Sequence, residues 1–279
     1  MVPVIVAALV ATGPVSQLSE TQLDQRIAEA HGKPLLERID EMSRMFVGTT
    51  YGELPLGDGS GPEAWPRWRV DKVDCQTFVE TVLALSNARN LKEAKAILDD
   101  IRYARPPPSF ENRNHFTEAQ WLPANEQKGY LKDEVPLIDG HAPTETLTLR
   151  KAQWSQLPIL SRLANANIPD GKFMVRYLPT EDLRRKAKNI EPGSIIFVVR
   201  ENNPRYVVRI SHMGFVIKGP GGWVVRHAST GAEHAVIDEP LGAYIQRMES
   251  YKKWKVIGFS LATPLDAALR VSQIATASR

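Results

Sequence analysis

The sequence predicts an α+β protein, because helical patterns fill the front of the chain and strand patterns fill its back. Before about residue 105, apolar side chains recur every three or four positions, as on amphipathic helices. From Lys172 onward, segments rich in β-branched and aromatic residues alternate with short turns, as in antiparallel strands. The chain has 279 residues, of which 43% are hydrophobic, enough for one large domain. We expect that domain over residues 17–265, followed by a C-terminal tail over residues 266–279.

Helices are expected in three places in the first hundred residues. Residues 17–46 carry apolar side chains at helical spacing throughout. Asp74 can cap a helix that runs to about Asn87, and Asn90 can cap the next one. The helical front half therefore ends shortly after residue 100.

Residues 105–172 read as an irregular insertion with short helices, because a Pro-Pro-Pro run opens it and further Pro and Gly residues follow. Behind it, the tetrapeptide Gly-Pro-Gly-Gly at 219–222 is typical of a hairpin connection. Six strands are expected, over residues 173–178, 194–200, 206–210, 213–218, 223–227 and 254–261.

The first residues and the charge bear on location and partners. Residues 1–12 are apolar and too short to span a bilayer, so we expect residues 1–16 to be a signal or export remnant, the alternative being a buried strand. The net charge of +3, without a basic block, excludes a nucleic-acid-binding protein of the usual kind. We expect no stable membrane span, and the oligomeric state stays open.

The single cysteine, Cys75, stands where a charged loop becomes a helix. A helix N-terminus carries partial positive charge that stabilises a thiolate, which is the nucleophilic form. A cysteine hydrolase also needs an imidazole base and a group that orients it. His212 and His227 flank a predicted hairpin, so two adjacent strands can bring both imidazoles together. We expect Cys75 as nucleophile, His212 as base and His227 as orienting group.

A metal site is the alternative use of the same residues. Cys75, His212 and His227 could hold zinc, which takes three or four such ligands. The paired short spacings common in zinc sites, His-x-x-x-His and Cys-x-x-Cys, do not occur in the sequence. We therefore expect neither a metal nor another cofactor.

The three residues and their contexts resemble a known family. Asp74-Cys75 at a helix start, residues 211–216 (SHMGFV) and residues 226–231 (RHASTG) resemble the NlpC-type papain-like bacterial cell-wall hydrolases. The resemblance implies a papain-like fold, in which the nucleophile helix packs on a C-terminal antiparallel sheet. It also implies the same three catalytic roles.

The residues after the cysteine narrow the resemblance. The common family form has small residues there, whereas this chain has Gln76-Thr77. The run from Asp74 to Glu80 (DCQTFVE) is similar to that of the N-acetylmuramoyl-L-alanine amidase-like branch, and the likeness extends over residues 35–260. It implies hydrolysis of the amide between N-acetylmuramic acid and L-alanine in peptidoglycan fragments, in the periplasm or cell envelope.

The resemblance also implies four substrate-binding residues, each with a plainer reading as a structural residue. Tyr51 would stand at the rim of the site, and Arg113 would suit a carboxylate or sugar oxygen. His115 would accompany it, and Asp74 would contact substrate besides capping its helix.

Three other functions stay open. The first is a γ-D-glutamyl-diamino acid endopeptidase acting on the same cell-wall peptides. The second is a non-catalytic wall-binding module, which has no need of the thiol. The third is a lipid acyltransferase of similar fold, for which the sequence carries no amphipathic or lipidation signal.

Overall fold

A computed structural model describes residues 14–156, 160–163 and 169–277 as a mixed α/β structure built on an antiparallel sheet. The helices are α1 (Glu20–Ala30), α2 (Leu35–Arg44), α3 (Cys75–Asn87), α4 (Leu91–Arg102), α5 (Leu122–Gln127), α6 (Val135–Ile138), α7 (Lys151–Trp154), α8 (Thr180–Lys186), α9 (Leu241–Glu249) and α10 (Ala268–Ala277). The strands are β1 (Thr50–Tyr51), β2 (Lys72–Val73), β3 (Leu131–Asp133), β4 (Thr144–Leu149), β5 (Gly171–Arg176), β6 (Leu178–Pro179), β7 (Ile195–Arg200), β8 (Ile210–Gly219), β9 (Gly222–Ala228), β10 (Val236–Pro240) and β11 (Val256–Pro264).

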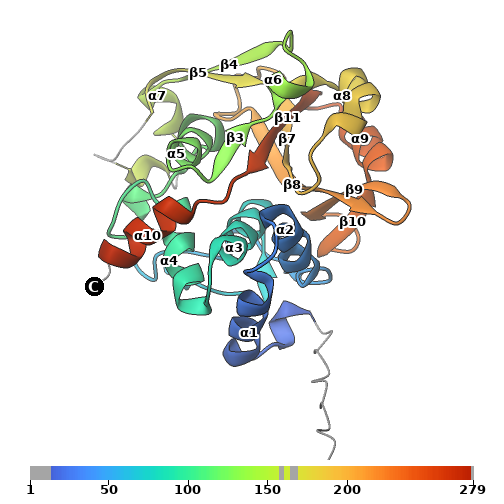
Figure 1. Ribbon diagram of the computed structural model, residues 1–279. Coiled ribbons are helices and arrows are strands. Elements are labelled where there is room, and N and C mark those ends of the chain that lie inside the picture. Colours follow the sequence, from blue (N-terminus) through green and yellow to red (C-terminus); the bar gives the residue numbers. More distant parts are fainter. Residues whose placement is uncertain (1–13, 157–159, 164–168, 278–279) are drawn as a thin grey trace, which may run out of the picture.

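The main sheet has the strand order β10-β9-β8-β7-β11-β3, with β6 paired to β11. Each of these neighbours is antiparallel. Two short pairs lie outside it: β1 with β2, and β4 with β5. The β4–β5 pair lies at the end of the molecule opposite α1 (Figure 1). The predicted antiparallel sheet in the back half of the chain is thus confirmed.

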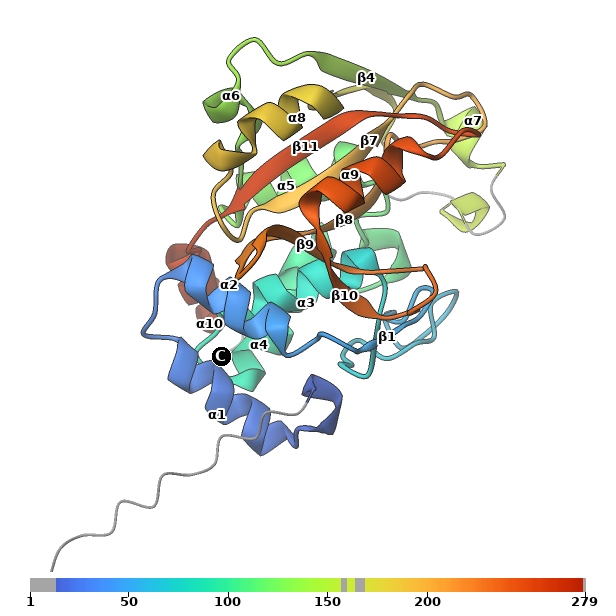
Figure 2. The same ribbon diagram turned by 90° about the vertical axis from the view of Figure 1, so that its right-hand side faces the viewer.

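Helices cover both faces of the sheet (Figure 2). Ile195, Phe197 and Val199 of β7 belong to the core that the sheet shares with α1, α2, α3 and α4. The alternate residues Ile196 and Val198 belong to a second core with α8 and α9. Since successive side chains of a strand point to opposite faces, β7 is a central strand buried on both sides.

The front half is helical as predicted, with one difference. Asp74 and Asn90 are the N-caps of α3 and α4, in agreement with the sequence. The single helix expected over residues 17–46 is instead two helices, α1 and α2. The break falls at His31–Pro34, because a proline cannot continue a helix and Pro34 becomes the N-cap of α2.

The strands differ from expectation in three places. Residues 173–178 contribute β5, but β5 pairs with β4 of the insertion and stands apart from the main sheet. No strand forms over residues 206–209 of the described chain; there Tyr206 stacks on Trp254 with ring centroids 3.9 Å apart. The insertion supplies β3 to the sheet edge, and β10 and α9 follow β9 without having been predicted.

The structure describes most of the predicted C-terminal tail but little of the predicted N-terminal remnant. The predicted signal or export remnant falls almost wholly in residues 1–13, which lie outside the described residues. The predicted C-terminal tail contains α10, whose Val271 is buried in the same core as α4. No helix in the described part of the chain is long and apolar enough to cross a membrane.

Candidate active site

Cys75 is the first residue of α3 and owes its position to the cap before it. The Asp74 carboxylate accepts the backbone N–H of Thr77 at 2.7 Å, and the Thr77 hydroxyl accepts the N–H of Asp74 at 2.9 Å. This reciprocal arrangement is a capping box, which fixes where a helix begins. One turn on, the ring of Phe78 packs on Phe215 of β8 with centroids 5.6 Å apart. The cap and this contact together hold the thiol against β8.

The partly buried Cys75 sulfur accepts a hydrogen bond from the backbone N–H of Met213, the residue next to His212. Burial, helped by the negative charge of Asp74, raises the pKa of Cys75 to about 12, although backbone N–H groups favour the thiolate. The thiolate expected from the helix N-terminus is therefore not the resting form, because desolvation outweighs the helix. A nucleophilic role for this thiol would therefore require a base that removes its proton.

His212 on β8 and His227 on β9 meet as the hairpin prediction required. The Nε2 atom of His212 lies 2.9 Å from Nδ1 of His227, and the rings are nearly perpendicular. The pairing of β8 with β7 shifts at this point and leaves Ser211 and His212 opposite a single residue. Such a bulge turns a side chain away from its regular direction.

Gly214 makes the histidine pair possible. It lies across from His227, and a Cβ atom built on it would stand 2.7 Å from the His227 Cβ and 2.7 Å from the Arg226 carbonyl oxygen. Both distances are too short for any larger residue. The β9 backbone and the His227 Cβ therefore occupy the space that a side chain at position 214 would fill, and the imidazole of His227 reaches His212 diagonally.

Both imidazoles are uncharged at neutral pH. Burial is the main cause that lowers the pKa of His212 well below 6.5, followed by the charge that His227 would carry if protonated and by the charge of Arg247. Burial and the positive charge of Arg247 likewise lower the pKa of His227, against the opposing effect of Glu239. Since His227 is only 1% exposed, water cannot compensate a charge there.

Three residues that sequence reasoning missed complete the surroundings of the pair. The Glu239 carboxylate on β10 lies 3.2 Å from His227 Nε2, and Arg247 of α9 binds the same carboxylate. Tyr244 of α9 is fully buried, with its ring 5.2 Å from the ring of His227 and 6.4 Å from that of His212. A signal for Glu239 was present, since an acidic residue one strand after His227 can face it. That signal is readable only once the strand register is known.

Tyr51, predicted at the rim, is half-buried on β1, and its ring lies 5.2 Å from His234. Burial raises its pKa to about 12, with further contributions from the charge that Cys75 would carry as a thiolate and from the negative charge of Asp74. The phenol therefore stays protonated and lies within electrostatic reach of the Cys75 sulfur. Its role as a substrate contact remains a prediction.

The other predicted substrate ligands are occupied within the protein. Arg113 binds Glu63 at 2.5 Å and His115 Nδ1 at 3.0 Å, while His115 Nε2 lies 2.7 Å from the Phe110 carbonyl oxygen. Burial and the charge of Arg113 lower the pKa of His115 to about 3. These contacts favour a structural role for both, and the cap bonds favour the same for Asp74.

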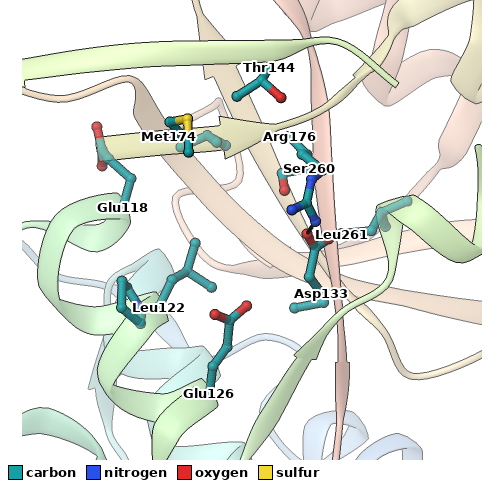
Figure 3. A pocket seen from close by; sticks show the side chains of 12 residues that line it. Glu118, Leu122, Glu126, Asp133, Thr144, Met174, Arg176, Ser260 and Leu261 are labelled. Carbon is teal, nitrogen blue, oxygen red and sulfur yellow. Dashed lines mark hydrogen bonds and ion pairs between the residues drawn. The ribbon is translucent and has the colours of Figure 1, made fainter. Parts of the chain in front are cut away.

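A separate acidic cavity of about 290 Å³ lies between α5, β3, β5 and β11, and none of the predicted site residues lines it (Figure 3). Arg176 and Asp133 form an ion pair of 2.8 Å on its wall. Glu118, also on the wall, accepts the backbone N–H of Arg209 just before β8. Burial raises the pKa of Glu118 to about 7. In the described part of the chain no group of three or more His, Cys, Asp and Glu side chains is arranged to hold a metal ion.

Solved structures share this fold. A protein from Legionella pneumophila str. Philadelphia 1, of the family DUF1460, superimposes with a TM-score of 0.76 and 27% identity, covering 88% of this chain and 95% of its own. A structure titled N-acetylmuramoyl-L-alanine amidase, from Bacteroides uniformis ATCC 8492, has a TM-score of 0.66 and 23% identity, covering 83% and 99%. At that identity the second likeness concerns the fold alone.

The family comparison agrees with the branch that the sequence indicated. No curated protein matches the chain significantly. The comparisons leave the wider NlpC-type, papain-like assignment as a prediction. The AmiA-like family, described as N-acetylmuramoyl-L-alanine amidase-like, matches residues 41–251, about three quarters of the chain. The chain therefore belongs to this amidase-like family.

Proposed function

We propose that the protein is a cysteine amidase that hydrolyses the amide between N-acetylmuramic acid and L-alanine in cell-wall fragments. The proposal rests on the contact between Cys75 and β8. Its sulfur binds the N–H of Met213, and the preceding residue, His212, is one half of a hydrogen-bonded imidazole pair. Family membership supplies the substrate class. A cell-wall substrate also favours an envelope or periplasmic location.

The first half of the reaction forms a thioester. His212 accepts the proton of the Cys75 thiol as the sulfur attacks the carbonyl carbon of the lactyl group. The carbon–nitrogen bond then breaks, and His212 returns the proton to the departing amine of L-alanine. The backbone N–H of Cys75, at the start of α3, is the natural donor to the oxyanion.

The second half releases the sugar acid. His212 takes a proton from water as the water oxygen attacks the thioester carbon. The carbon–sulfur bond breaks, and the proton passes to sulfur to restore the thiol. A neutral imidazole is required at the start of each half, and the lowered pKa of His212 provides it.

The test is hydrolysis of defined muropeptides, with products identified by mass. We expect free N-acetylmuramic acid and a peptide beginning with L-alanine. Cys75→Ala and His212→Ala should each lose at least about 10³-fold in kcat/KM. His141→Ala is the matched control, because this histidine lies exposed on a turn and should leave the rate unchanged.

Two outcomes would contradict the proposal. Cleavage within the peptide would replace the amidase by the γ-D-glutamyl endopeptidase alternative while keeping the thiol chemistry. A rate for Cys75→Ala equal to that of the native protein, with both chains folded, would remove the thiol chemistry itself.

A further inference from the structure

Glu239 ends a line of hydrogen bonds that crosses three neighbouring strands. His212 on β8 meets His227 on β9 at 2.9 Å, and His227 Nε2 meets Glu239 Oε2 on β10 at 3.2 Å. Arg247 then donates to both carboxylate oxygens, to Oε2 from Nη2 at 2.6 Å and to Oε1 from Nε at 3.0 Å. Because the Glu239 side chain is only 14% exposed, this arrangement is largely shielded from water.

We propose that Glu239, held by Arg247, fixes the tautomers of both histidines, so that Nδ1 of His212 is the basic atom of the site. The proposal deepens the amidase function proposed above and rests on it. Glu239 and Arg247 are positioning residues in this reaction, since they act through the imidazoles and touch no reacting atom.

The assignment follows from counting protons along the line. An ionised carboxylate only accepts, so the Nε2 atom of His227 must carry a hydrogen. A neutral imidazole has one N–H, so Nδ1 of His227 is an acceptor. The Nε2 atom of His212 must then donate to it, and the lone pair of His212 is left on Nδ1.

The charges around the line agree with this count. The groups that surround the two imidazoles are Arg200 of β7, Glu239 of β10, and Tyr244 and Arg247 of α9. Cys75 of α3 acts in turn on Tyr244. Burial raises the pKa of Glu239, but the hydrogen bonds and charge of Arg247 outweigh burial and lower it overall, so the carboxylate is ionised. Both histidines are neutral for the reasons given above.

Glu239 also decides between two possible proton arrangements. Arg247 Nη2 lies 3.5 Å from His227 Nε2 and could donate to it. In that case His227 would carry its hydrogen on Nδ1, His212 would carry its own on Nδ1, and no base would face the thiol. Glu239 stands closer to His227, at 3.2 Å, and engages the same Arg247 nitrogen at 2.6 Å. These distances favour the arrangement that leaves a base.

Nitrogen-15 NMR of histidine-labelled protein tests the tautomers directly and without substrate. We expect Nε2–H tautomers for His212 and His227 in the native chain near pH 7. An Nδ1–H tautomer at His227 would overturn the proposal. This measurement needs no hydrolysis, so its result is valid even if the protein cleaves another bond. A failure of the tautomer assignment can therefore be told apart from a failure of the proposed amidase function.

Glu239→Gln tests the consequence for catalysis, with Asp238→Asn as the matched control. Asp238 is the neighbouring carboxylate of β10, but it binds Arg226 on the opposite face of the sheet. We expect Glu239→Gln to lower kcat/KM at least about 10-fold, within the range that a general base contributes. The acid limb of its pH–rate profile should move to lower pH, since the negative charge that favours an imidazolium is gone.

Asp238→Asn should keep the native rate and profile. A folded Glu239→Gln protein with the native rate, pH profile and tautomers would contradict the assignment. If Glu239→Gln does not fold, the tautomers of the native chain still decide the question.

Discussion

At the scale of single residues, the site combines a protonated thiol with two neutral imidazoles. Burial raises the pKa of Cys75 to about 12 and lowers the pKa of His212 well below 6.5. Charge separation is therefore unfavourable before substrate arrives, and in the proposed mechanism the thiol proton moves to His212 only as the sulfur attacks. A base of this kind works only while it is uncharged.

The pH dependence of the rate should report this base. We expect kcat/KM to be constant from neutral pH down to about 6.5, the ordinary histidine value, and to fall only at lower pH as His212 is protonated. The measurement is kcat/KM on a defined muropeptide between pH 4 and 8, with Cys75→Ala as the blank. An acid limb centred at or above pH 6.5 would argue against a neutral His212.

The sequence predicted the residues whose signals are local. Cys75 was visible from its capping aspartate, and His212 and His227 from the hairpin between them. Glu239, Tyr244 and Arg247 carry no local pattern, since their relation to the histidines depends on strand register and on where α9 folds back. The substrate-binding role of Arg113 and His115 stays a prediction. The contacts that favour a structural role could not be foreseen, because the buried Glu63 that engages Arg113 lies 50 residues before it.

At the scale of elements, β8 is the strand that organises the site. Its bulge directs His212, its next backbone N–H binds the thiol, and Gly214 admits His227 from β9. The predicted β8–β9 hairpin was correct because its Gly-rich turn is a strong signal. The bulge could not be predicted, because it arises from pairing with β7.

Gly214→Ala tests the close packing of β8 on β9. The added methyl would meet His227 and the Arg226 carbonyl oxygen at 2.7 Å, so the strands must move apart. We expect a loss of about 1–3 kcal/mol in the free energy of unfolding, measured with denaturant. Activity should fall further than this loss explains, because His227 is displaced.

Gly221→Ala, in the turn of the same hairpin, is the control. An added Cβ there meets nothing within 4 Å, and no left-handed backbone is required. Its stability and rate should match those of the native chain. A Gly214→Ala protein with native stability and rate would show that the close approach is not required.

At the scale of the whole molecule, ion pairs join separate elements of the fold. Arg226 of β9 binds Asp238 of β10 and also reaches Asp40 and Ser43 of α2. Arg102 of α4 pairs with the buried Glu80 of α3. The order of helices and strands was predictable, whereas the contacts of Arg226 with α2 were not, since they join residues 183 and 186 positions apart in the chain.

Glu118 should make stability depend on pH in a recognisable way. Its pKa is about 7 in the folded state against 4.5 for the free group, so the folded chain holds the proton longer. The stability that this raised pKa contributes to the free energy of unfolding is fully present below pH 4.5 and is lost as the pH rises through 7. By linkage the loss in the free energy of unfolding is on the order of 3 kcal/mol.

Glu118→Gln keeps the acceptor for the Arg209 N–H and removes the titration. Between pH 5 and pH 8 the native chain should lose stability that Glu118→Gln keeps. The difference in free energy of unfolding, measured by chemical denaturation, should therefore shift in favour of the variant as the pH rises. Glu111→Gln, exposed on the short 3-10 helix Phe110–Asn112, should show the same pH dependence as the native chain throughout. If the stability of the native protein and that of Glu118→Gln depend equally on pH, the raised pKa of the buried Glu118 carboxyl is contradicted.

The hairpin connection at Gly219–Gly222 has a consequence for the evolution of this site. The β8–β9 pairing continues from this turn to Phe215 opposite Arg226, with His212 and His227 beyond. Side chains alternate along a strand, so one residue inserted in the turn could send His227 to the face that Arg226 now occupies. The length of this loop, which contains no predicted catalytic residue, therefore determines on which face of the sheet His227 lies. Sequence drift in that loop should be constrained in length, and at Gly222 also in composition, since a φ of +116° favours glycine.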